Sequence, residues 1–367
     1  MISQPATSQE EIYCIILHVR EPVERQLALS WALRGICSLE TRTEKMAGTP
    51  GVLFICGGGH SGSTLLDLLL GEHPSITSVG EVSTLNDYIE LPERICSCMR
   101  LTRDCPFWQR ALSSFDVPTV TGVDDPAART VSISKTHPLD MRRVHTTSLS
   151  LKLQYLSSGA YFAAGCADNR DNAILRRISP SVMSRMDDVH RLFDGIREQS
   201  GSSIVVDSSK HVYRFRLLRA SRPESVRCIF LVRDGRARTF SDMRSEGLDA
   251  ASAARKWLRV NLKTRSMIAP IPASHRLALT YEELCREPET TLRKVCSFTG
   301  LDYNDGMLSM QFDDMHNIGG NRSRFGGISE IREDTRWREH MQAADLATFE
   351  GIGGQLNRQL LGQHYRQ

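Results

Sequence analysis

The residues whose types and spacing best suit chemistry lie in one short loop, GGGHSGST, which runs from Gly57 to Thr64. Consecutive glycines let a backbone turn sharply and approach a ligand closely, and serine and threonine hydroxyls can bind anion oxygens. We therefore interpret the loop as a phosphate cradle. Its candidate binding residues are Gly58, Gly59, His60, Ser61, Gly62, Ser63 and Thr64.

Two elements would position this loop. Residues 52–56 form an apolar run typical of a strand buried on both faces. After the loop, leucines recur at helical spacing from 65 to 70, until Gly71 and Pro74 end the pattern. The first N–H groups of such a helix have no partner within it and face the loop, where they favour an anion.

The spacing within the loop argues against a nucleotide-hydrolysing P-loop, which reads G-x-x-x-x-G-K-[ST]. Gly57 and Gly62 have the required separation, but Ser63 occupies the position of the lysine. The cationic candidate in the loop is His60. The plain alternative to a phosphate cradle is a tight strand–helix turn that binds no ligand.

A second candidate site lies in LVRDGRARTFSDMR, residues 231–244. Arg233 follows a predicted buried strand, and Ser241 lies eight residues later in the predicted helix. A guanidinium can bind two oxygens of a phosphate and a serine hydroxyl a third. The alternative is a surface helix with ordinary arginines.

Two further polar residues follow other predicted strands. Lys210 comes after an apolar strand that ends at Asp207, and we place it in the first turn of the next helix. An ammonium group there would stabilise charge on a leaving oxygen. Glu81 follows the cradle helix and could return to the same edge, where a carboxylate can remove a proton from a hydroxyl. The alternatives are a Walker-B-like metal ligand for Asp207 and an exposed helix cap for Glu81.

With these motifs, residues 51–362 resemble the PAPS-dependent sulfotransferases, including the carbohydrate and tyrosyl-protein enzymes. The resemblance implies that the loop binds the 5′-phosphosulfate of PAPS and that Arg233 with Ser241 holds its 3′-phosphate. It implies that Lys210 is directed at the sulfuryl group and that Glu81 lies near the acceptor.

The same resemblance implies three more nucleotide contacts. Tyr281 ends a predicted strand in LTYEEL, which is similar to the family segment L-R-Y-E-D-L. Arg322 and Arg324, in GGNRSRF, stand where these enzymes close a glycine-rich loop over the 3′-phosphate and the adenine. The clearest departure is His60, because many relatives carry arginine or lysine there.

We therefore predict transfer of a sulfuryl group from PAPS to a hydroxyl of a small-molecule, carbohydrate or lipid acceptor, with PAP as product. Glu81 would deprotonate the acceptor, while Lys210 and His60 would stabilise the departing phosphate. No metal ion is expected in this reaction. The competing functions are a P-loop kinase of a small metabolite and a non-catalytic PAP-binding module.

The chain alternates strands and helices, which predicts an α/β fold with a P-loop-like parallel sheet flanked by helices. Further strands are expected at 202–207, 226–234 and 276–281, with helices at 211–220, 235–246, 249–267, 288–300 and 343–362. A mainly helical insertion, 90–200, would shape the acceptor pocket; it contains helical patterns at 142–165 and 180–199 and a surface excursion at 114–140. Residues 46–367 would form the domain, and 1–45 an extension, with Met46 as the natural start.

Most of the ten cysteines are scattered and suit a reducing cytosol, where thiols behave as small hydrophobes. Cys96, Cys98 and Cys105 are the exception, because they lie close together in CSCMRLTRDCPFW. They could bind zinc, but a fourth ligand is not evident. One disulfide with a free thiol is a second possibility, and a purely structural role is the one we favour.

The composition sets the broad class of the protein. A formal net charge of +3 on 367 residues gives no argument for a nucleic-acid or membrane partner. No run approaches the 18 apolar residues of a membrane span, and no signal peptide is visible at the start. These features lead us to expect a cytoplasmic protein. They leave the acceptor and the oligomeric state open.

Overall fold

The computed structural model describes residues 49–362, apart from 92, 116–148, 164–170, 313 and 327. The predicted extension 1–45, the start at Met46 and most of the surface excursion 114–140 lie outside the described residues. Within the described part of the chain, no helix combines the length and the hydropathy needed to cross a bilayer.

The core is a parallel sheet of five strands in the order β2-β3-β1-β4-β5. The strands are β1 (Val52–Gly57), β2 (Ile76–Ser78), β3 (Ile204–Lys210), β4 (Val226–Val232) and β5 (Arg276–Thr280). β1 is central, with β3 on one side and β4 on the other. The predicted α/β fold with a parallel sheet is confirmed.

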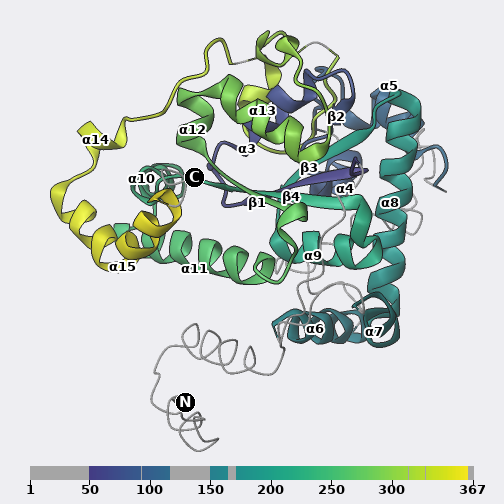
Figure 1. Cartoon of the computed structure of the whole chain (residues 1–367), viewed down its shortest axis with the longest axis horizontal. Coiled ribbons are helices and arrows are strands. Elements are labelled where there is room, and N and C mark those ends of the chain that lie inside the picture. The colour runs from purple at the N-terminus through teal and green to yellow at the C-terminus, as the bar shows by residue number, and fades with distance from the viewer. Residues whose placement is uncertain are drawn as a thin grey trace, which may run out of the picture.

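Alternate residues of the strands build two separate apolar cores, one on each face of the sheet. In β1, Phe54 packs into the core beneath α8 (Pro180–Ser200), α9 (Val212–Ser221) and α11 (Ala250–Ile268). Leu53 and Ile55 face the core beneath α3 (Ser63–Gly71), α12 (Tyr281–Arg286) and α13 (Pro288–Thr299). Successive side chains of a strand point to opposite faces, so a strand covered on both sides must be apolar throughout. In Figure 1, α3, α12 and α13 lie on one side of the sheet and α9 and α11 on the other.

The helices agree closely with the sequence pattern. Those expected are α3 (Ser63–Gly71), α8 (Pro180–Ser200), α9 (Val212–Ser221), α10 (Gly235–Glu246), α11 (Ala250–Ile268), α13 (Pro288–Thr299) and α15 (Ala343–Gly362). The helical pattern predicted at 142–165 corresponds, within the described residues, to α6 (Leu149–Ala163). The insertion also contains α5 (Pro106–Leu112) and α7 (Asp171–Ile178), and α4 (Leu85–Glu90) precedes it. Short α12 (Tyr281–Arg286) and α14 (Trp337–His340) complete the set.

One boundary differs from the prediction and matters for the site. β3 continues through Ser208 and Ser209 to Lys210, and α9 begins only at Val212. Ser208 and Ser209 therefore do not cap the helix; their hydroxyls donate to Asp67 and Asp207 instead. Lys210 is the last residue of a strand, not part of a helical turn.

Asp67 joins the cradle helix α3 to its surroundings from a buried position. Its Oδ2 accepts hydrogen bonds from Ser208 (3.2 Å) and from the amide of Asn317 (2.7 Å). Burial raises the pKa of Asp67 to about 7, although hydrogen bonds from Ser78, Asn317 and Ser208 oppose that shift. The folded protein therefore holds this proton more tightly than the unfolded chain does.

We expect Asp67→Asn to stabilise the fold at pH 8 but not at pH 5. The stability contributed by the Asp67 proton is complete below the pKa of an unfolded aspartate and is lost as the pH rises through about 7. An amide keeps the hydrogen bonds without the charge, and the gain at pH 8 should be on the order of 1 kcal/mol. Urea unfolding at both pH values measures it. Asp104→Asn, at an exposed aspartate, is the control, and an equal gain at both pH values would contradict the assignment.

Candidate functional site

The cradle loop joins β1 to α3, and two of its glycines are required by close contacts. A Cβ atom at Gly57 would lie 2.5 Å from the carbonyl oxygen of Leu231 in β4. Gly62 has a φ of 86°, and a Cβ there would lie 2.4 Å from the ring of Tyr281. The loop is therefore packed tightly between β4 and Tyr281, and neither position accepts a side chain without displacement of its neighbours.

Three consecutive carbonyl groups of the loop are held by hydrogen bonds. Ser61 Oγ donates to Gly58 O (2.7 Å), Arg238 Nε donates to Gly59 O, and Arg233 Nη1 donates to His60 O (3.0 Å). In a trans peptide the C=O and the following N–H point in opposite directions. The N–H groups of residues 59 to 61 thus point away from these donors, and together with the N–H groups at the start of α3 they are suited to bind an anion.

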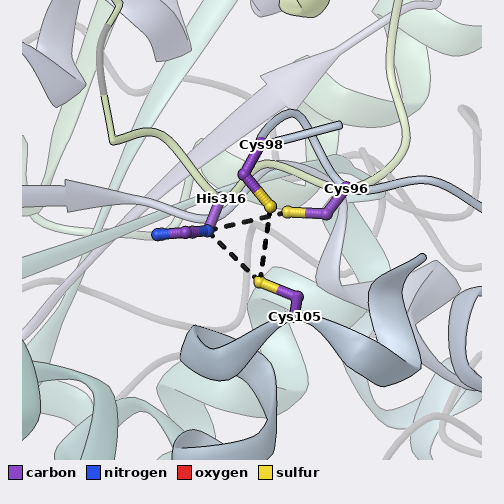
Figure 2. A group of neighbouring side chains, drawn as sticks. All are labelled: Cys96, Cys98, Cys105 and His316. Carbon is purple, nitrogen blue, oxygen red and sulfur yellow. Dashed lines mark hydrogen bonds between the residues drawn. The ribbon is translucent and has the colours of Figure 1, made fainter. Parts of the chain in front are cut away.

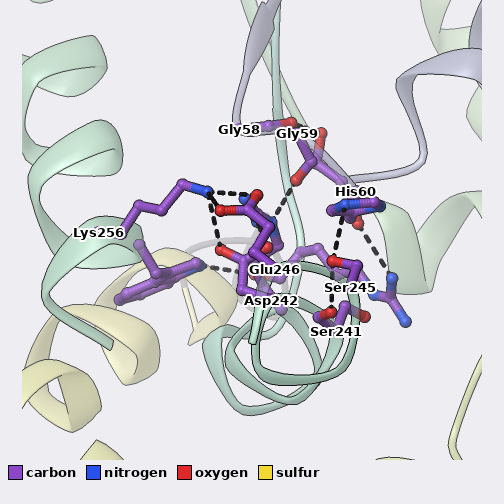
Figure 3. A network of polar contacts seen from close by, with 12 residues as sticks. Gly58, Gly59, His60, Ser241, Asp242, Ser245, Glu246 and Lys256 are labelled. Atoms are coloured by element: carbon purple, nitrogen blue, oxygen red, sulfur yellow. Dashed lines mark hydrogen bonds and ion pairs between the residues drawn. The ribbon is translucent and has the colours of Figure 1, made fainter. Parts of the chain in front are cut away.

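The side chain of Arg238 is itself held in place by an ion pair within α10. Its Nη1 donates to Asp242 Oδ1 (2.6 Å) one turn along α10, and both side chains are buried. Lys256 from α11 lies 2.6 Å from Glu246 Oε1 and 3.5 Å from Asp242 Oδ2. Figure 3 shows this network of α10 and α11 beneath Gly58 and Gly59. The charges under the loop are paired, so its position is set by a rigid network.

Arg233, at the end of β4, shares an acidic partner with a second arginine. Its Nη2 lies 3.2 Å from Asp334 Oδ2. Arg336 binds the same carboxylate with both Nε (2.7 Å) and Nη2 (2.9 Å). These two guanidinium groups lower the pKa of Asp334, with Arg336 the larger cause. One carboxylate is thus gripped by two cations at the edge of the loop.

Tyr281 connects this acidic segment to the cradle. Its ring covers Gly62, and the Arg233 guanidinium stacks on it at 4.7 Å. Its hydroxyl donates to Arg332 O (3.0 Å) and accepts from the N–H of Asp334 (3.1 Å). The predicted residue Tyr281 therefore lies beside both predicted phosphate-binding clusters.

His60 and Ser241 lie on the α10 side of the loop. His60 Nε2 is 3.4 Å from Ser245 Oγ, one turn beyond Ser241 in α10, as Figure 3 shows. Within the described part of the chain, Ser241 Oγ bonds only to its own helix, at Ala237 O (3.0 Å). Burial and the charge of Arg238 lower the pKa of His60, so the imidazole is neutral at neutral pH.

Glu81 and Lys210 form an ion pair on the other side of the loop. The Lys210 ammonium donates to Glu81 Oε1, and each side chain is less than one-fifth exposed. Lys210 has a φ of 69°, an unfavourable backbone for a lysine, and such strain is concentrated at functional sites. The structure therefore brings these two predicted residues together, whereas the His60 ring contacts Ser245 of α10.

A glycine pair in the C-terminal part of the chain links Glu81 to the cradle. A Cβ at Gly320 would lie 2.9 Å from Thr64 Oγ1 and 3.6 Å from Glu81 Oε1. The N–H of Asn321 donates to Thr64 Oγ1 (3.2 Å). Gly320 thus lies between Glu81 Oε1 and the first turn of α3, so the predicted base adjoins the predicted anion site.

The two arginines predicted in the glycine-rich loop differ in their surroundings. Arg324 is buried, and its Nη2 donates to Tyr88 Oη (3.2 Å) and Ile95 O (3.3 Å) on the insertion side. Arg322 is exposed. The Arg324 guanidinium therefore contacts α4 and the segment after it rather than Arg233 or Ser241, whereas the role of Arg322 stays a prediction.

The sequence reasoning missed Asp334 and Arg336, which complete the charged edge beside Arg233. They lie in an irregular segment with no periodicity, Asp334 being 101 residues beyond Arg233, and only the tertiary contact of Arg233 with Asp334 reveals them. A cluster of alternating charges, REDTRWRE, was the available signal.

A family model described as "Sulfotransferase family" matches residues 50–305, which is more than half of the chain. That match spans the cradle loop, Glu81, Lys210, Arg233, Ser241 and Tyr281. No curated protein sequence matches the chain significantly.

Solved structures also resemble the chain. The sulfotransferase domain of the olefin synthase from Synechococcus PCC 7002 is 18% identical with a TM-score of 0.44, over 86% of this chain and 98% of that one. Sulfotransferase STF9 from Mycobacterium avium is 12% identical with a TM-score of 0.41, over 97% of both chains. Sulfotransferase STF1 from Mycobacterium tuberculosis H37Rv is 13% identical with a TM-score of 0.39, over 90% and 83%. The family assignment rests on the sequence match.

We expect His60 to titrate below the ordinary histidine value of 6.5 in the ligand-free protein, because burial and Arg238 disfavour its charged form. Glu246 opposes this shift, so Glu246→Gln should lower the pKa of His60 further. NMR titration of the ring protons measures both, with Glu350→Gln in the distant α15 as the control. A His60 pKa above 6.5 in the free protein would contradict the electrostatic account.

Proposed function

The chain belongs to the sulfotransferase family, and we propose that it transfers a sulfuryl group from PAPS to a hydroxyl group of a small-molecule, carbohydrate or lipid acceptor. The observation that carries this proposal is the hydrogen bond from Arg233 to His60 O (3.0 Å). It joins the end of β4 to the cradle loop, so groups suited to the two ends of one bis-phosphorylated nucleotide meet at one sheet edge.

We propose that the 3′-phosphate of PAPS binds where Asp334 now lies between Arg233 and Arg336. A carboxylate held by two guanidinium groups is the nearest protein equivalent of a phosphate in such a site. The Ser241 hydroxyl, bonded only within its helix among the described contacts, is available as a third donor. Nucleotide binding would displace the Asp334 carboxylate from Arg233.

The 5′-phosphosulfate would bind in the loop itself. The N–H groups of residues 59 to 61 and those of the first turn of α3 face this position, and the helix dipole favours negative charge there. His60 belongs to the loop, and its neutral imidazole would donate a hydrogen bond to the departing phosphate. Its contact with Ser245 of α10 supports this role, because Ser241 of the same helix would bind the nucleotide.

The Glu81–Lys210 pair would carry the transfer. Glu81 takes the proton of the acceptor hydroxyl as its oxygen attacks sulfur, and the bond between sulfur and the 5′-phosphate oxygen breaks. The electron pair of that bond leaves with PAP, where Lys210 stabilises the developing charge. In the ligand-free protein the two side chains neutralise each other, which keeps both ordered.

The contacts of Asp207 argue against a kinase. Its carboxylate is fully buried, accepts from the N–H of Ser209 (2.9 Å) and lies 3.6 Å from Arg214 Nε. Burial raises the pKa of Asp207, which disfavours the charged form that a Walker-B metal ligand needs. The position of the P-loop lysine is taken by Ser63, which leaves a nucleoside triphosphate without its usual cation.

We also propose that the enzyme works in the cytosol. The seven cysteines within the described residues are all free thiols, as in proteins of reducing compartments.

We predict that Ser241→Ala weakens binding of PAP about tenfold, because one hydrogen bond to a charged phosphate is lost. Binding of 5′-AMP, which lacks the 3′-phosphate, should not change. Ser157→Ala is a matched control, since that exposed serine also bonds the carbonyl four residues earlier in its helix. Calorimetric titration measures all four combinations. Equal loss for PAP and 5′-AMP would reject the 3′-phosphate role of Ser241.

Glu81→Gln should lower kcat for labelled sulfate transfer by about 10²-fold or more, because a positioned general base is lost. The affinity for PAP should stay within about twofold, since Glu81 faces the acceptor side. Glu198→Gln, at an exposed position in α8, is the control. Turnover within a few fold of the native enzyme would remove Glu81 from the reaction.

A further inference from the structure

Four side chains outside the proposed active site converge on one point. Cys96, Cys98 and Cys105 come from the loop after α4, and His316 comes from a segment 211 residues beyond Cys105. Their sulfur atoms and the imidazole nitrogen all lie within 4.8 Å of one another. Figure 2 shows the three sulfurs and the ring nitrogen turned toward a common centre. The fourth partner that the sequence did not reveal is therefore a histidine distant in the chain.

The separations suit a single tetrahedral metal ion. Cys98 and Cys105 Sγ are 3.6 Å apart, and His316 Nδ1 is 3.3 Å from Cys105 Sγ and 3.8 Å from Cys96 Sγ. A zinc ion with ordinary bond lengths holds two sulfurs about 3.8 Å apart and a sulfur and a nitrogen about 3.6 Å apart. A disulfide would need about 2.05 Å, and the three thiols are free.

The backbone around the cysteines forms a tight turn. The N–H of Met99 donates to Cys96 O (2.9 Å), and the N–H of Cys96 donates to Arg100 O (2.9 Å). Met99 has a φ of 65°, and its side chain is 69% exposed. This strained turn, with an apolar side chain left in solvent, directs two thiols to one side. Cys105 supplies the third from the start of α5.

His316 is oriented by the same helix. Its ring stacks on Phe107 at 4.6 Å and 11°, and its carbonyl accepts from Trp108 Nε1 (3.0 Å). This helix thus carries one ligand, Cys105, at its start. Through Phe107 and Trp108 it also fixes the orientation of a second ligand, His316. Because the imidazole is held before any ion binds, the donor set is preorganised.

From this geometry we propose a structural zinc site formed by Cys96, Cys98, Cys105 and His316. Three thiolates with one imidazole is an established donor set for structural zinc, and soft sulfur ligands in tetrahedral geometry exclude magnesium and calcium. Four protein ligands leave no position for substrate, so the ion takes no part in chemistry. A cluster with several irons would hold its thiolates farther apart than these separations.

The ion would fasten the segment that supports Glu81. Ser97, within the cysteine turn, donates its hydroxyl to Met315 O (2.6 Å) and accepts from the N–H of Asn317 (2.7 Å). Two residues after His316, Ile318 O accepts from the N–H of Glu81 (2.7 Å). The metal assignment is independent of the reaction, whereas the consequence for Glu81 rests on the proposed function.

The first test is the metal content of the full chain, purified without chelator, by inductively coupled plasma and native mass spectrometry. We expect one zinc per chain, and on replacement with Co²⁺ the ligand-field absorption of a tetrahedral site and thiolate-to-cobalt charge transfer. Folded protein with no bound metal, or a disulfide among the three cysteines found by mass, would overturn the proposal.

Variants separate ligands from packing residues. Cys98→Ser and His316→Ala should each lose at least nine-tenths of the zinc, whereas His316→Cys restores four ligands and should keep it. Cys98 is only half-buried, so its serine variant is the one expected to fold. Cys296→Ser is the control for a buried thiol outside the cluster. Full zinc content in Cys98→Ser would reject Cys98 as a ligand and the proposed four-ligand site with it.

Zinc removal should also lower kcat more than it changes PAP affinity, since it loosens the segment behind Glu81 and leaves Arg233 in place. If the protein binds zinc but transfers no sulfate, the metal site stands and the proposed function fails. If the enzyme transfers sulfate at the same rate before and after verified zinc removal, only the proposed coupling to Glu81 is wrong. The metal site and the proposed function then both stand.

Discussion

The site depends on two buried arginines that hold consecutive carbonyl groups of one glycine loop. Arg238 binds Gly59 O and Arg233 binds His60 O, so the peptide N–H groups between them face the opposite side. A loop of glycines has much conformational freedom in the unfolded chain, and these hydrogen bonds select one geometry. Without them the anion site would lose its preorganisation, whatever the helix dipole of α3 contributes.

The parallel sheet then places two kinds of chemistry on the two sides of that loop. β1 is flanked by β3 and β4, and the carboxyl end of each strand carries a functional residue. β3 ends in Lys210, which pairs with Glu81, and β4 is followed by Arg233, which pairs with Asp334. The cradle loop thus lies between the proposed acid–base pair, Glu81 and Lys210, and the proposed 3′-phosphate site beside Arg233. A donor held by both would present its sulfur toward Glu81.

Local pattern was enough to predict the parallel sheet, the cradle loop and the pairing of Arg233 with it, because strand ends of a parallel sheet meet at one edge. It was not enough for Asp334 or His316, which lie in aperiodic segments and reach their partners only through long-range contacts. Arg324 was predicted at the nucleotide, but its guanidinium lies with Tyr88 and Ile95. A residue type and a glycine-rich setting do not specify which way an irregular loop turns.

The central claim is that Arg233 and the glycine loop grip the same nucleotide. A crystal structure of the protein with PAP tests it most directly. The account predicts the 5′-phosphate against the N–H groups of residues 59 to 64, and the 3′-phosphate between Arg233 and Arg336 with the Asp334 carboxylate displaced. A PAP molecule bound elsewhere, with Asp334 still on Arg233, would contradict it.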